Sequence, residues 1–540
     1  MTRPVFTREA TGLVRKLGML DAFVISISII GPSGGVIGML FMPFYFPGSN
    51  AILVFALGAV PAIFFAITYS IFTGLMPRSG GDYVWTGRVL GPRIASMFAI
   101  LFLFAQIVSF ISFNGWTFVS AFLSQLLFTL GLKTNSASLL AMSTTVTQPL
   151  WGFAIASIML IFIILIGILG MDAYKTFNRY AFYFYAVAML VFIGEVIALS
   201  NQAFRAAFDS SLQGYNVTYD SVVSAAATNP SLTTFSLSST ILAFPLIGFL
   251  TYSGFNFNTY VAGETRDVSR SLSRAMLLSV LVTLIYLTTF AWAAYSAFGS
   301  TFLSGISYLY NTGALPSLPV QPTANFLLAL TLPVWLGAFV NISVGIVFFL
   351  VPLQSLIMFS RIVFAMSFDR MLPVRFSNVN DRFGSPHYAV LLVGIISLIF
   401  EALYWLAGPG LLSGFLNTSV AVDVAYLIPG FAALLFPILK KDMYKSLESH
   451  LNGWLRWKVG GVPLLSIGGL AIVLIWLFGI YTQLVPISSY TYLGSSIPLA
   501  ITYTIVPAVV GLVIYEGSKA YHQKRDGLDI SLAFTQVPPE

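Results

Sequence analysis

Long apolar stretches alternate along this chain with short segments that carry most of the charge, Pro and Gly. A bilayer is crossed by roughly 20 apolar residues in a helix. Twelve stretches reach that length, near 20–46, 50–75, 93–130, 150–169, 176–200, 238–261, 274–298, 325–366, 387–407, 412–437, 463–485 and 496–516. The pattern predicts an all-α membrane protein with twelve transmembrane helices. The third and eighth stretches exceed one bilayer thickness, so we expect long, tilted helices there.

Composition agrees with this class. The 540 residues are 57% hydrophobic and 8% charged, and the mean hydropathy is +0.88. Cysteine is absent, which excludes disulfides, thiolate metal sites and cysteine nucleophiles. Residues 1–20 are polar and basic and contain no separate apolar core or cleavage site, so we expect the first span itself to direct insertion.

The basic residues predict the orientation. If the N-terminus is cytoplasmic, the inner segments hold all but Lys133 and Arg205 of the 26 Lys and Arg residues. This asymmetry favours cytoplasmic N- and C-termini, in a cell or plasma membrane. It also explains the net charge of +7 without nucleic acid, because the positive charge faces the anionic inner leaflet.

Two interruptions occur at corresponding places in the two halves of the chain. Gly31-Pro32-Ser33-Gly34-Gly35 lies in the first span and Thr251-Tyr252-Ser253-Gly254-Phe255 in the sixth. A broken helix in lipid leaves backbone groups unpaired, which is tolerated only where the break lines a cavity or meets a ligand. Paired interruptions of this kind are typical of transporters built from inverted repeats, so both breaks are candidate binding sites.

This layout predicts six regions. They are a cytoplasmic segment 1–19, a first repeat 20–200 (spans 1–5), an extracellular loop 201–237, a second repeat 238–437 (spans 6–10), a cytoplasmic loop with spans 11 and 12 over 438–516, and a cytoplasmic tail 517–540. Residues 131–148 and 299–323 form further outer loops. Asn216-Val217-Thr218 matches a glycosylation acceptor, a pattern that chance also produces.

Four stretches carry a resemblance to a known family. They are Arg8-Glu9-Ala10-Thr11-Gly12-Leu13 leading into the first break; Met76-Pro77-Arg78-Ser79-Gly80-Gly81-Asp82-Tyr83; Gly254-Phe255 with Gly263-Glu264-Thr265-Arg266-Asp267, Arg274 and Ala275; and Arg361-Ile362-Val363-Phe364-Ala365-Met366 with Asp369, Leu372-Pro373 and Ser385-Pro386. From about Glu9 to the end of the tenth span, the chain resembles the amino acid, polyamine and organocation (APC) transporter family. The resemblance implies a 5+5 inverted repeat (helices 1–5 and 6–10) with discontinuous helices 1 and 6, plus two C-terminal helices.

The family resemblance further implies that spans 1 and 6 hold the substrate backbone, while spans 3, 6, 8 and 10 sort its side chain. Helix physics agrees, because a half-helix N-terminus attracts a carboxylate and a half-helix C-terminus attracts an ammonium. The candidate substrate-binding residues are Ile30, Gly31, Ser33, Gly34, Gly35, Phe249, Leu250, Thr251, Tyr252, Ser253, Gly254 and Asn114. Phe249 and Tyr252 would gate the site or simply pack, and Asn114 would line it or join helices. An apolar wall at Phe249 and Leu250 favours neutral or hydrophobic amino acids.

The sequence departs from the family at the positions that carry coupling ions. Some relatives place a proton-carrying lysine in the fifth span, where this chain has Tyr185, and sodium-coupled relatives place hydroxyls in the eighth, where Ile346 to Pro352 has none. Asp423, near the middle of the tenth span, is the remaining coupling candidate. A mid-span Asp costs about 2.5 to 3.5 kcal/mol on insertion scales, so Asp423 either carries a proton, contacts substrate, or is a protonated structural residue.

Other charged and aromatic residues have structural interpretations. Glu195 and Glu401 lie near the outer ends of their spans, from which they would reach toward water. Glu264, Arg266, Asp82 and Arg88 are expected to form a charge network on the inner face. Five tryptophans fall near predicted membrane interfaces and are interpreted as belt anchors, namely Trp85, Trp151, Trp405, Trp454 and Trp457.

The sequence therefore predicts a secondary transporter of amino acids or related amines that works by alternating access and is proton-coupled or an exchanger. A transporter-like nutrient sensor is the alternative. A membrane-embedded enzyme is less consistent with the sequence, because His387, His450 and His522 are far apart and no acid pair recurs within the bilayer. No phosphate-binding loop, cofactor or metal site is predicted. The expected partners are a small-molecule substrate, protons and the lipid bilayer.

Overall fold

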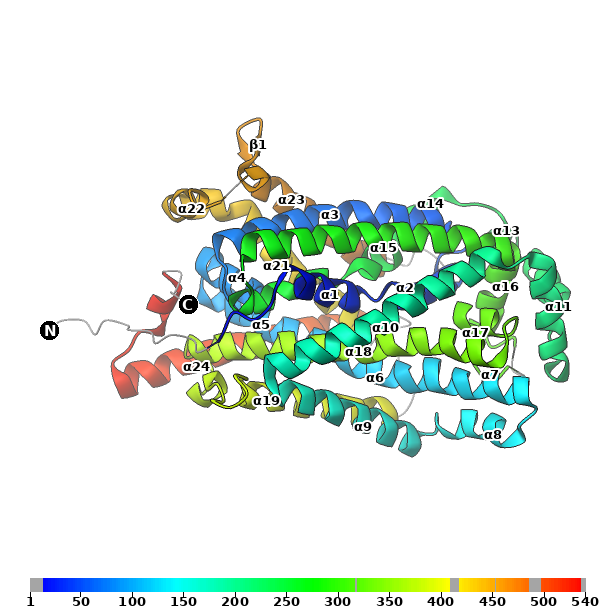
Figure 1. The fold of residues 1–540 in the computed structure, drawn as a ribbon. Coiled ribbons are helices and arrows are strands. Elements are labelled where there is room, and N and C mark those ends of the chain that lie inside the picture. Colours follow the sequence, from blue (N-terminus) through cyan, green and yellow to red (C-terminus); the bar gives the residue numbers. More distant parts are fainter. Residues whose placement is uncertain (1–12, 316–317, 408–416, 452, 485–496, 536–540) are drawn as a thin grey trace.

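Eleven of the helices that the structure describes are long and apolar enough to cross a membrane. The structure is a computed structural model that describes residues 13–315, 318–407, 417–451, 453–484 and 497–535. The eleven helices are Met19–Tyr45 (α1 Met19–Ile30 and α2 Pro32–Tyr45), α3 Ala51–Leu75, Pro92–Thr134 (α5 to α7), α9 Pro149–Ile168, α10 Gly170–Ala198, α15 Val268–Phe298, α18 Val334–Phe368, α19 His387–Leu406, α21 Thr418–Leu439, α23 Leu464–Leu484 and α24 Ile497–Asp526. They run side by side as one elongated bundle (Figure 1). Each corresponds to a predicted span.

The sixth predicted span, 238–261, is the one missing from that set, because it is irregular along most of its length. It consists of α14 Leu237–Ala243, the π-helix η4 Phe244–Phe249, the 3-10 helix η5 Leu250–Tyr252 and the 3-10 helix η6 Phe255–Glu264. Pro245 has no backbone N–H, so it cannot donate to an α-helical ladder at the start of η4. Gly254 separates η5 from η6 with a φ of 99°. The predicted interruption is present, and the distortion extends well beyond the five residues expected.

The first break lies where the sequence predicts it. Gly31 ends α1 and begins α2 in the left-handed region, with φ 55° and ψ 66°. Pro32 follows at the first position of α2, where a missing N–H leaves no hydrogen bond unmade. The glycine and the proline together stop one helix and start the next.

The third and eighth stretches differ in regularity. The third is one continuous rod in which two π-helices, η1 Ile107–Ser112 and η2 Phe118–Leu123, alternate with α5 Pro92–Gln106, α6 Phe113–Thr117 and α7 Ser124–Thr134. The eighth was expected over 325–366 as one helix. The structure instead has a short α17 Ala324–Ala329, and α18 begins after Pro333. At 35 residues, α18 is still long enough to extend beyond the bilayer.

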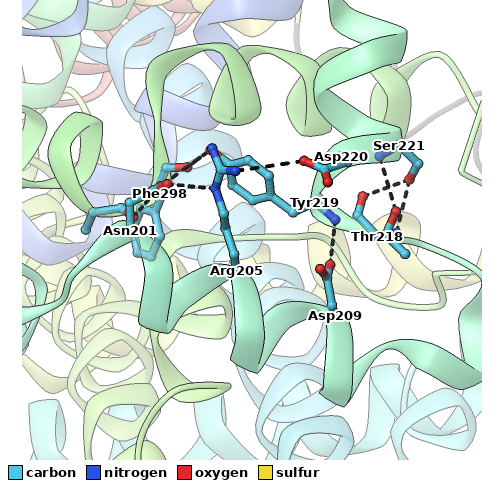
Figure 2. A network of polar contacts seen from close by, with 9 residues as sticks. Asn201, Arg205, Asp209, Thr218, Tyr219, Asp220, Ser221 and Phe298 are labelled. Carbon is cyan, nitrogen blue, oxygen red and sulfur yellow. Dashed lines mark hydrogen bonds and ion pairs between the residues drawn. The ribbon is translucent and has the colours of Figure 1, made fainter.

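Short helices cover the end of the bundle where the sequence predicts polar outer loops, and this end is called the outer end. They are α8 Ala137–Thr145, α11 Asn201–Ser211, the 3-10 helix η3 Gln213–Tyr215, α12 Tyr219–Ala227, α13 Pro230–Thr233 and α16 Ser300–Asn311. Figure 2 shows how Arg205 ties α11 to α12: its Nε donates to Asn201 at 2.8 Å and its guanidinium lies 4.1 Å from the Tyr219 ring centre. The Tyr219 hydroxyl donates to the Phe298 carbonyl at 3.1 Å, which fastens this cover to α15.

The opposite end, where the sequence predicts the inner loops, is called the inner end and carries the remaining elements. They are α4 Asp82–Leu90, the 3-10 helices η7 Val374–Ser377, η8 Gly453–Arg456 and η9 Ile530–Phe534, α22 Lys441–Glu448, and a hairpin of β1 Lys458–Val459 and β2 Val462–Pro463. The end of α24 lies at this end of the bundle, as do α22 and the hairpin (Figure 1). Phe534 of η9 is buried, and the Arg88 guanidinium lies 4.9 Å from its ring centre. The C-terminal segment therefore packs onto α4.

Three side chains lie elsewhere than the sequence suggests. Glu401 is fully buried rather than directed toward water, and its Oε1 accepts from the Trp405 indole at 2.8 Å. Trp405 and Trp85 are buried too, at 5% and 0% exposure, so they are core residues rather than belt anchors. Trp151 and Trp457 are exposed, as an interfacial position requires. Position along a span gives depth, but it does not give the helix face.

Candidate functional site

The two helix breaks lie against each other in the interior of the bundle. On one side, Ser26 of α1 donates its hydroxyl to the Phe255 carbonyl at 2.9 Å, and Asn258 of η6 donates to that hydroxyl at 2.8 Å. On the other side, a Cβ added at Gly35 would overlap the Thr251 side chain. Residues more than 200 positions apart in sequence thus form one structural unit.

Glycine is required at both breaks for two separate reasons. Gly31 and Gly254 have φ angles of 55° and 99°, a region that side chains rarely adopt. Both are also tightly packed: a Cβ would overlap Val347 of α18 at Gly31 and Ile29 of α1 at Gly254. The breaks therefore depend on these glycines and contact the eighth span as well as each other.

Buried polar atoms without partners gather in the segments beside the breaks. The Ser28 hydroxyl, the Asn256 amide nitrogen and the Asn258 amide oxygen have no hydrogen-bond partner among the described residues, although all three side chains are at most 1% exposed. A buried polar group left without a partner costs about 1–3 kcal/mol. One donor, one acceptor and one hydroxyl are therefore available to a polar ligand at this position.

An aromatic shell surrounds the sixth-span break. Phe249 lies 4.9 Å from the Trp476 ring of α23, and that indole stacks on Tyr426 of α21 at 5.1 Å. The Gln106 amide donates to the Tyr426 hydroxyl at 3.2 Å, and the Ser253 side chain lies close to that hydroxyl. Spans 3, 6, 10 and 11 thus meet around Ser253, and the walls they supply are mainly aromatic.

The predicted binding residues divide into those that meet at the breaks and those that do not. Ile30, Gly31, Ser33, Gly35, Thr251, Ser253 and Gly254 lie at or beside the two breaks, and Phe249 belongs to the aromatic shell. For Gly34 and Leu250 only the backbone belongs to the described part of the chain. Tyr252 is turned away, because its hydroxyl donates to the Phe55 carbonyl of α3 at 2.9 Å.

Asn114 is also turned away from this site. Its amide donates to the Ser109 and Phe110 carbonyls of its own span at 3.4 and 3.1 Å. The residue of the third span that reaches the sixth-span break is Phe110, whose ring lies 5.4 Å from Phe257 and within van der Waals contact of a Cβ at Gly254. The third span therefore contacts the break through Phe110, and a role of Asn114 in substrate binding stays a prediction.

Tyr185 lies close to the fifth-span position at which the family resemblance would place a lysine. Its phenol oxygen accepts from the Ser33 amide at 3.1 Å and from the Ser33 hydroxyl at 3.2 Å. Both residues are fully buried. The fifth span therefore does reach the first break, through a neutral side chain.

Asp423 lies away from the breaks, in the contact between α21 and α23. One carboxyl oxygen accepts from the Gln483 amide and packs against Gly479, whereas the other has no partner among the described residues. Asp423 is 1% exposed. Tyr426, which belongs to the aromatic shell, is one helical turn further along α21, so Asp423 neighbours the site without lining it.

A network of buried charges closes the inner end below the breaks. Arg361 of α18 forms a bidentate pair with Glu264 of η6 at 2.8 and 3.2 Å, and Arg88 of α4 pairs with Asp369 at 3.0 Å. All four side chains are at most 3% exposed. Arg266 is also predicted to belong to this network, but it lies outside these two ion pairs and its Nε donates to the Arg15 carbonyl. The pairs join the sixth span to the eighth and α4 to the end of α18.

Asp82 forms a second contact between α4 and the sixth span. Its carboxylate accepts from the hydroxyls of Tyr69 at 2.7 Å and Tyr260 at 3.0 Å. Burial raises the pKa of Asp82 to about 7, although the two phenols oppose the shift by stabilising the charged form. The inner network thus contains a carboxyl that titrates near neutral pH.

Several residues of the site were not predicted individually. They are Ser26, Ser28, Asn256, Asn258, Tyr426 and Trp476. Ser26 and Ser28, like Asn256 and Asn258, are polar pairs within otherwise apolar sequence next to a break, and that local signal could have identified them. Nothing local distinguishes Tyr426 or Trp476, because their role depends on how spans 10 and 11 pack.

A family comparison decides the class of protein. The model of the amino acid permease family matches residues 17–507, which is most of the chain. The chain belongs to the amino acid permease family. This permease is therefore a multi-pass membrane transporter of the APC type rather than an enzyme, as the sequence motifs predict.

Relatives of this permease are distant but match along most of their length. An uncharacterized transporter of Mycobacterium tuberculosis is 26% identical over 441 residues, covering 80% of this chain and 83% of its own. A branched-chain amino acid permease of Bacillus subtilis is 24% identical, with 77% and 82% covered. A glutamate/serine transporter of the same bacterium is 22% identical, with 84% and 80% covered.

Proposed function

We propose that this permease carries amino acids or related amines across the cell membrane by alternating access, and that the paired breaks at Gly31 and Gly254 hold the substrate backbone. The observation that carries the proposal is the direct contact of the two breaks, together with the unpartnered polar atoms of Ser28, Asn256 and Asn258 beside them. A zwitterion suits such a place, because the interrupted helices expose peptide dipoles of both signs.

The proposal includes a layout of twelve spans in two inverted repeats of five, followed by two further helices. In this layout the irregular segment 237–264 would be the sixth crossing and the eleven long helices the others; the support is that the segment falls on the sixth predicted span. An even number of crossings puts both termini on one side. The positive-inside rule then assigns that side to the cytoplasm, since nearly all Lys and Arg belong to the predicted inner segments.

The substrate side chain is proposed to be neutral and apolar. The shell beside Ser253 supports this, because Phe249, Tyr426 and Trp476 offer aromatic faces and no charge. The similarity to a permease named for branched-chain amino acids points the same way, whereas another relative is named for glutamate and serine. Transport is proposed to be proton-coupled or an exchange, with Asp423 as the coupling candidate.

The test is counterflow in proteoliposomes against a panel of labelled amino acids, polyamines and nucleobases. Leucine-like substrates are expected to exchange fastest, and uptake would also distinguish a transporter from a sensor that binds without flux. Ser253→Leu is expected to abolish binding and counterflow while the protein still inserts and elutes as a single folded species. Ser210→Leu, at an exposed position of α11, serves as the control. Full counterflow by Ser253→Leu would contradict the site assignment.

A further inference from the structure

The inner loop between α21 and α23 is built as a rigid projection. The β1–β2 hairpin pairs Lys458 with Pro463 and Val459 with Val462. Gly460 and Gly461 connect the strands with φ angles of 56° and 80°, as a two-residue turn with the twist of a hairpin requires. The Leu464 amide closes the ladder by donating to the Trp457 carbonyl at 3.0 Å.

The two faces of this hairpin differ. Side chains alternate along a strand, and directly paired residues share a face, so Trp457, Val459 and Val462 lie together on one face. They are 66%, 62% and 47% exposed. The opposite face is fastened to the loop, since Lys458 pairs with Glu448 at 3.0 Å and Arg456 donates to the Ser449 carbonyl. One face is therefore anchored and the other is apolar and free.

Cations flank the free apolar face. The segment 440–459 has more positive than negative side chains. Its basic residues are all exposed, namely Lys440, Lys441, Lys445, Arg456 and Lys458, and its acidic residues are Asp442 and Glu448. α22 turns its apolar side inward, where Tyr444 is buried and lies 5.4 Å from the Phe436 ring. Its lysines consequently point outward. The loop presents an apolar hairpin face and a net positive charge to its surroundings.

The position of the loop brings these groups to the edge of the bilayer. Leu451 and Leu455 pack at Gly74, next to the inner end of α3, and α22 follows directly from the end of α21. The last two residues of α21, Ile438 and Leu439, are 70% and 54% exposed and belong to a membrane-crossing helix. In Figure 1 the hairpin stands out sideways from the bundle rather than along its axis. A sideways projection at this end of the bundle meets the headgroup region.

We propose that the hairpin face of Trp457, Val459 and Val462, with Lys440, Lys441 and Lys445, docks on the anionic headgroups of the inner leaflet. Trp is favoured at the membrane interface, Val adds apolar burial, and clustered lysines attract anionic lipid. The inference goes beyond the transport proposal and depends on it only for which leaflet is called inner.

The absence of cysteine from the sequence makes a clean test possible. Val459→Cys carries a spin label in full-length permease in nanodiscs of phosphatidylcholine alone or mixed with phosphatidylglycerol. Collision rates with oxygen report membrane, and those with a water-soluble nickel chelate report water. We expect the label to move from water to membrane when phosphatidylglycerol is added. Asp381→Cys, on an exposed inner loop remote in sequence, should stay in water in both lipids.

A charge variant tests the electrostatic part. With Lys440, Lys441 and Lys445 all changed to Gln, the hairpin equilibrium should shift toward water by about a hundredfold in the mixed lipid. A label at position 459 that stays equally exposed to nickel in both lipids would overturn the proposal. So would protection seen only in native membranes, which would indicate a protein partner instead. Uptake is not part of either measurement, so a failure of the transport proposal would be seen separately.

Discussion

Ser33 and Tyr185 connect the first helix break to the fifth span: the phenol oxygen of Tyr185 accepts from both the amide and the hydroxyl of Ser33, at 3.1 and 3.2 Å. The amide belongs to the first turn of α2, where no intrahelical acceptor exists. Tyr185 therefore satisfies a donor that the break creates. The link also makes the geometry of the break depend on where α10 lies.

Tyr185→Phe should destabilise the break, because it leaves the buried Ser33 amide without an acceptor. The expected loss is about 1–3 kcal/mol of unfolding free energy, with reduced counterflow. Thermal unfolding in detergent and counterflow in proteoliposomes measure the two effects. Tyr183→Phe, on the same helix but exposed, is the control and should change neither. Unchanged stability and transport in Tyr185→Phe would show that the link is dispensable.

Asp423→Asn should remove a proton-dependent component of uptake. Asn can still accept from Gln483, so packing between α21 and α23 is largely kept while the titratable carboxyl is lost. If Asp423 carries the coupling proton, the stimulation of uptake at acidic external pH disappears and exchange persists. Initial uptake rates across a pH series measure this. Glu195→Gln, a half-buried carboxyl on α10, is the matched control. A pH profile identical to that of the wild type would eliminate Asp423 from coupling.

Asp82→Asn should flatten the pH dependence of stability. Because burial raises the pKa of Asp82 to about 7, the folded protein holds this proton at pH values where the unfolded chain, with the ordinary Asp value, has lost it. This contribution to stability is fully present below about pH 4 and is lost as the pH rises through about 7. The pH range from about 4.5 to 8 covers the interval between the pKa of Asp82 in the unfolded chain and its pKa in the folded protein. Over this range the melting temperature of the wild type should therefore fall more than that of Asp82→Asn. Parallel curves would refute the assignment.

Glu264→Gln should be strongly destabilising, because it leaves the guanidinium of Arg361 buried without a countercharge. Breaking one side of a buried pair costs about 3–5 kcal/mol. The comparison is Arg93→Gln, which breaks the pair with Glu516 where both side chains are exposed, and it should cost far less because solvent screens the pair. Chemical or thermal unfolding of the two variants measures the difference. Equal effects would mean that the Glu264–Arg361 pair contributes no more than a surface contact.

The sequence predicts the spans and both breaks because these features depend on local chemistry. Apolar length specifies the crossings, and Gly31 and Gly254 stand out because only glycine combines a positive φ with close packing. The distortion of the sixth segment is less visible. Pro245 marks its beginning, but the succession of π- and 3-10 helices depends on the neighbouring spans.

Helix faces are the part that one sequence does not give. Tyr252 donates to the Phe55 carbonyl and Asn114 to its own helix, although the sequence places Tyr252 beside a break and Asn114 among the polar residues of the third span. Glu401 is buried against Trp405, although its depth near the end of a span predicts that it reaches toward water. A residue's depth follows from counting along the helix. The direction in which its side chain points depends on how the twelve expected spans pack against one another. That packing cannot be inferred from the sequence of one span alone.

The two π-helical segments of the third span, η1 and η2, have a consequence for the length of this part of the chain. Each accommodates an extra residue within a rod that otherwise has α-helical spacing. Deleting one residue within either segment would convert it to regular α-helix, and the residues beyond it would keep the faces they now present, because the wider winding absorbs that residue. A deletion in α5, α6 or α7 would instead turn everything beyond it by about 100° around the rod axis. Changes in the length of this span are therefore tolerated inside η1 and η2 and disruptive in the α-helical parts.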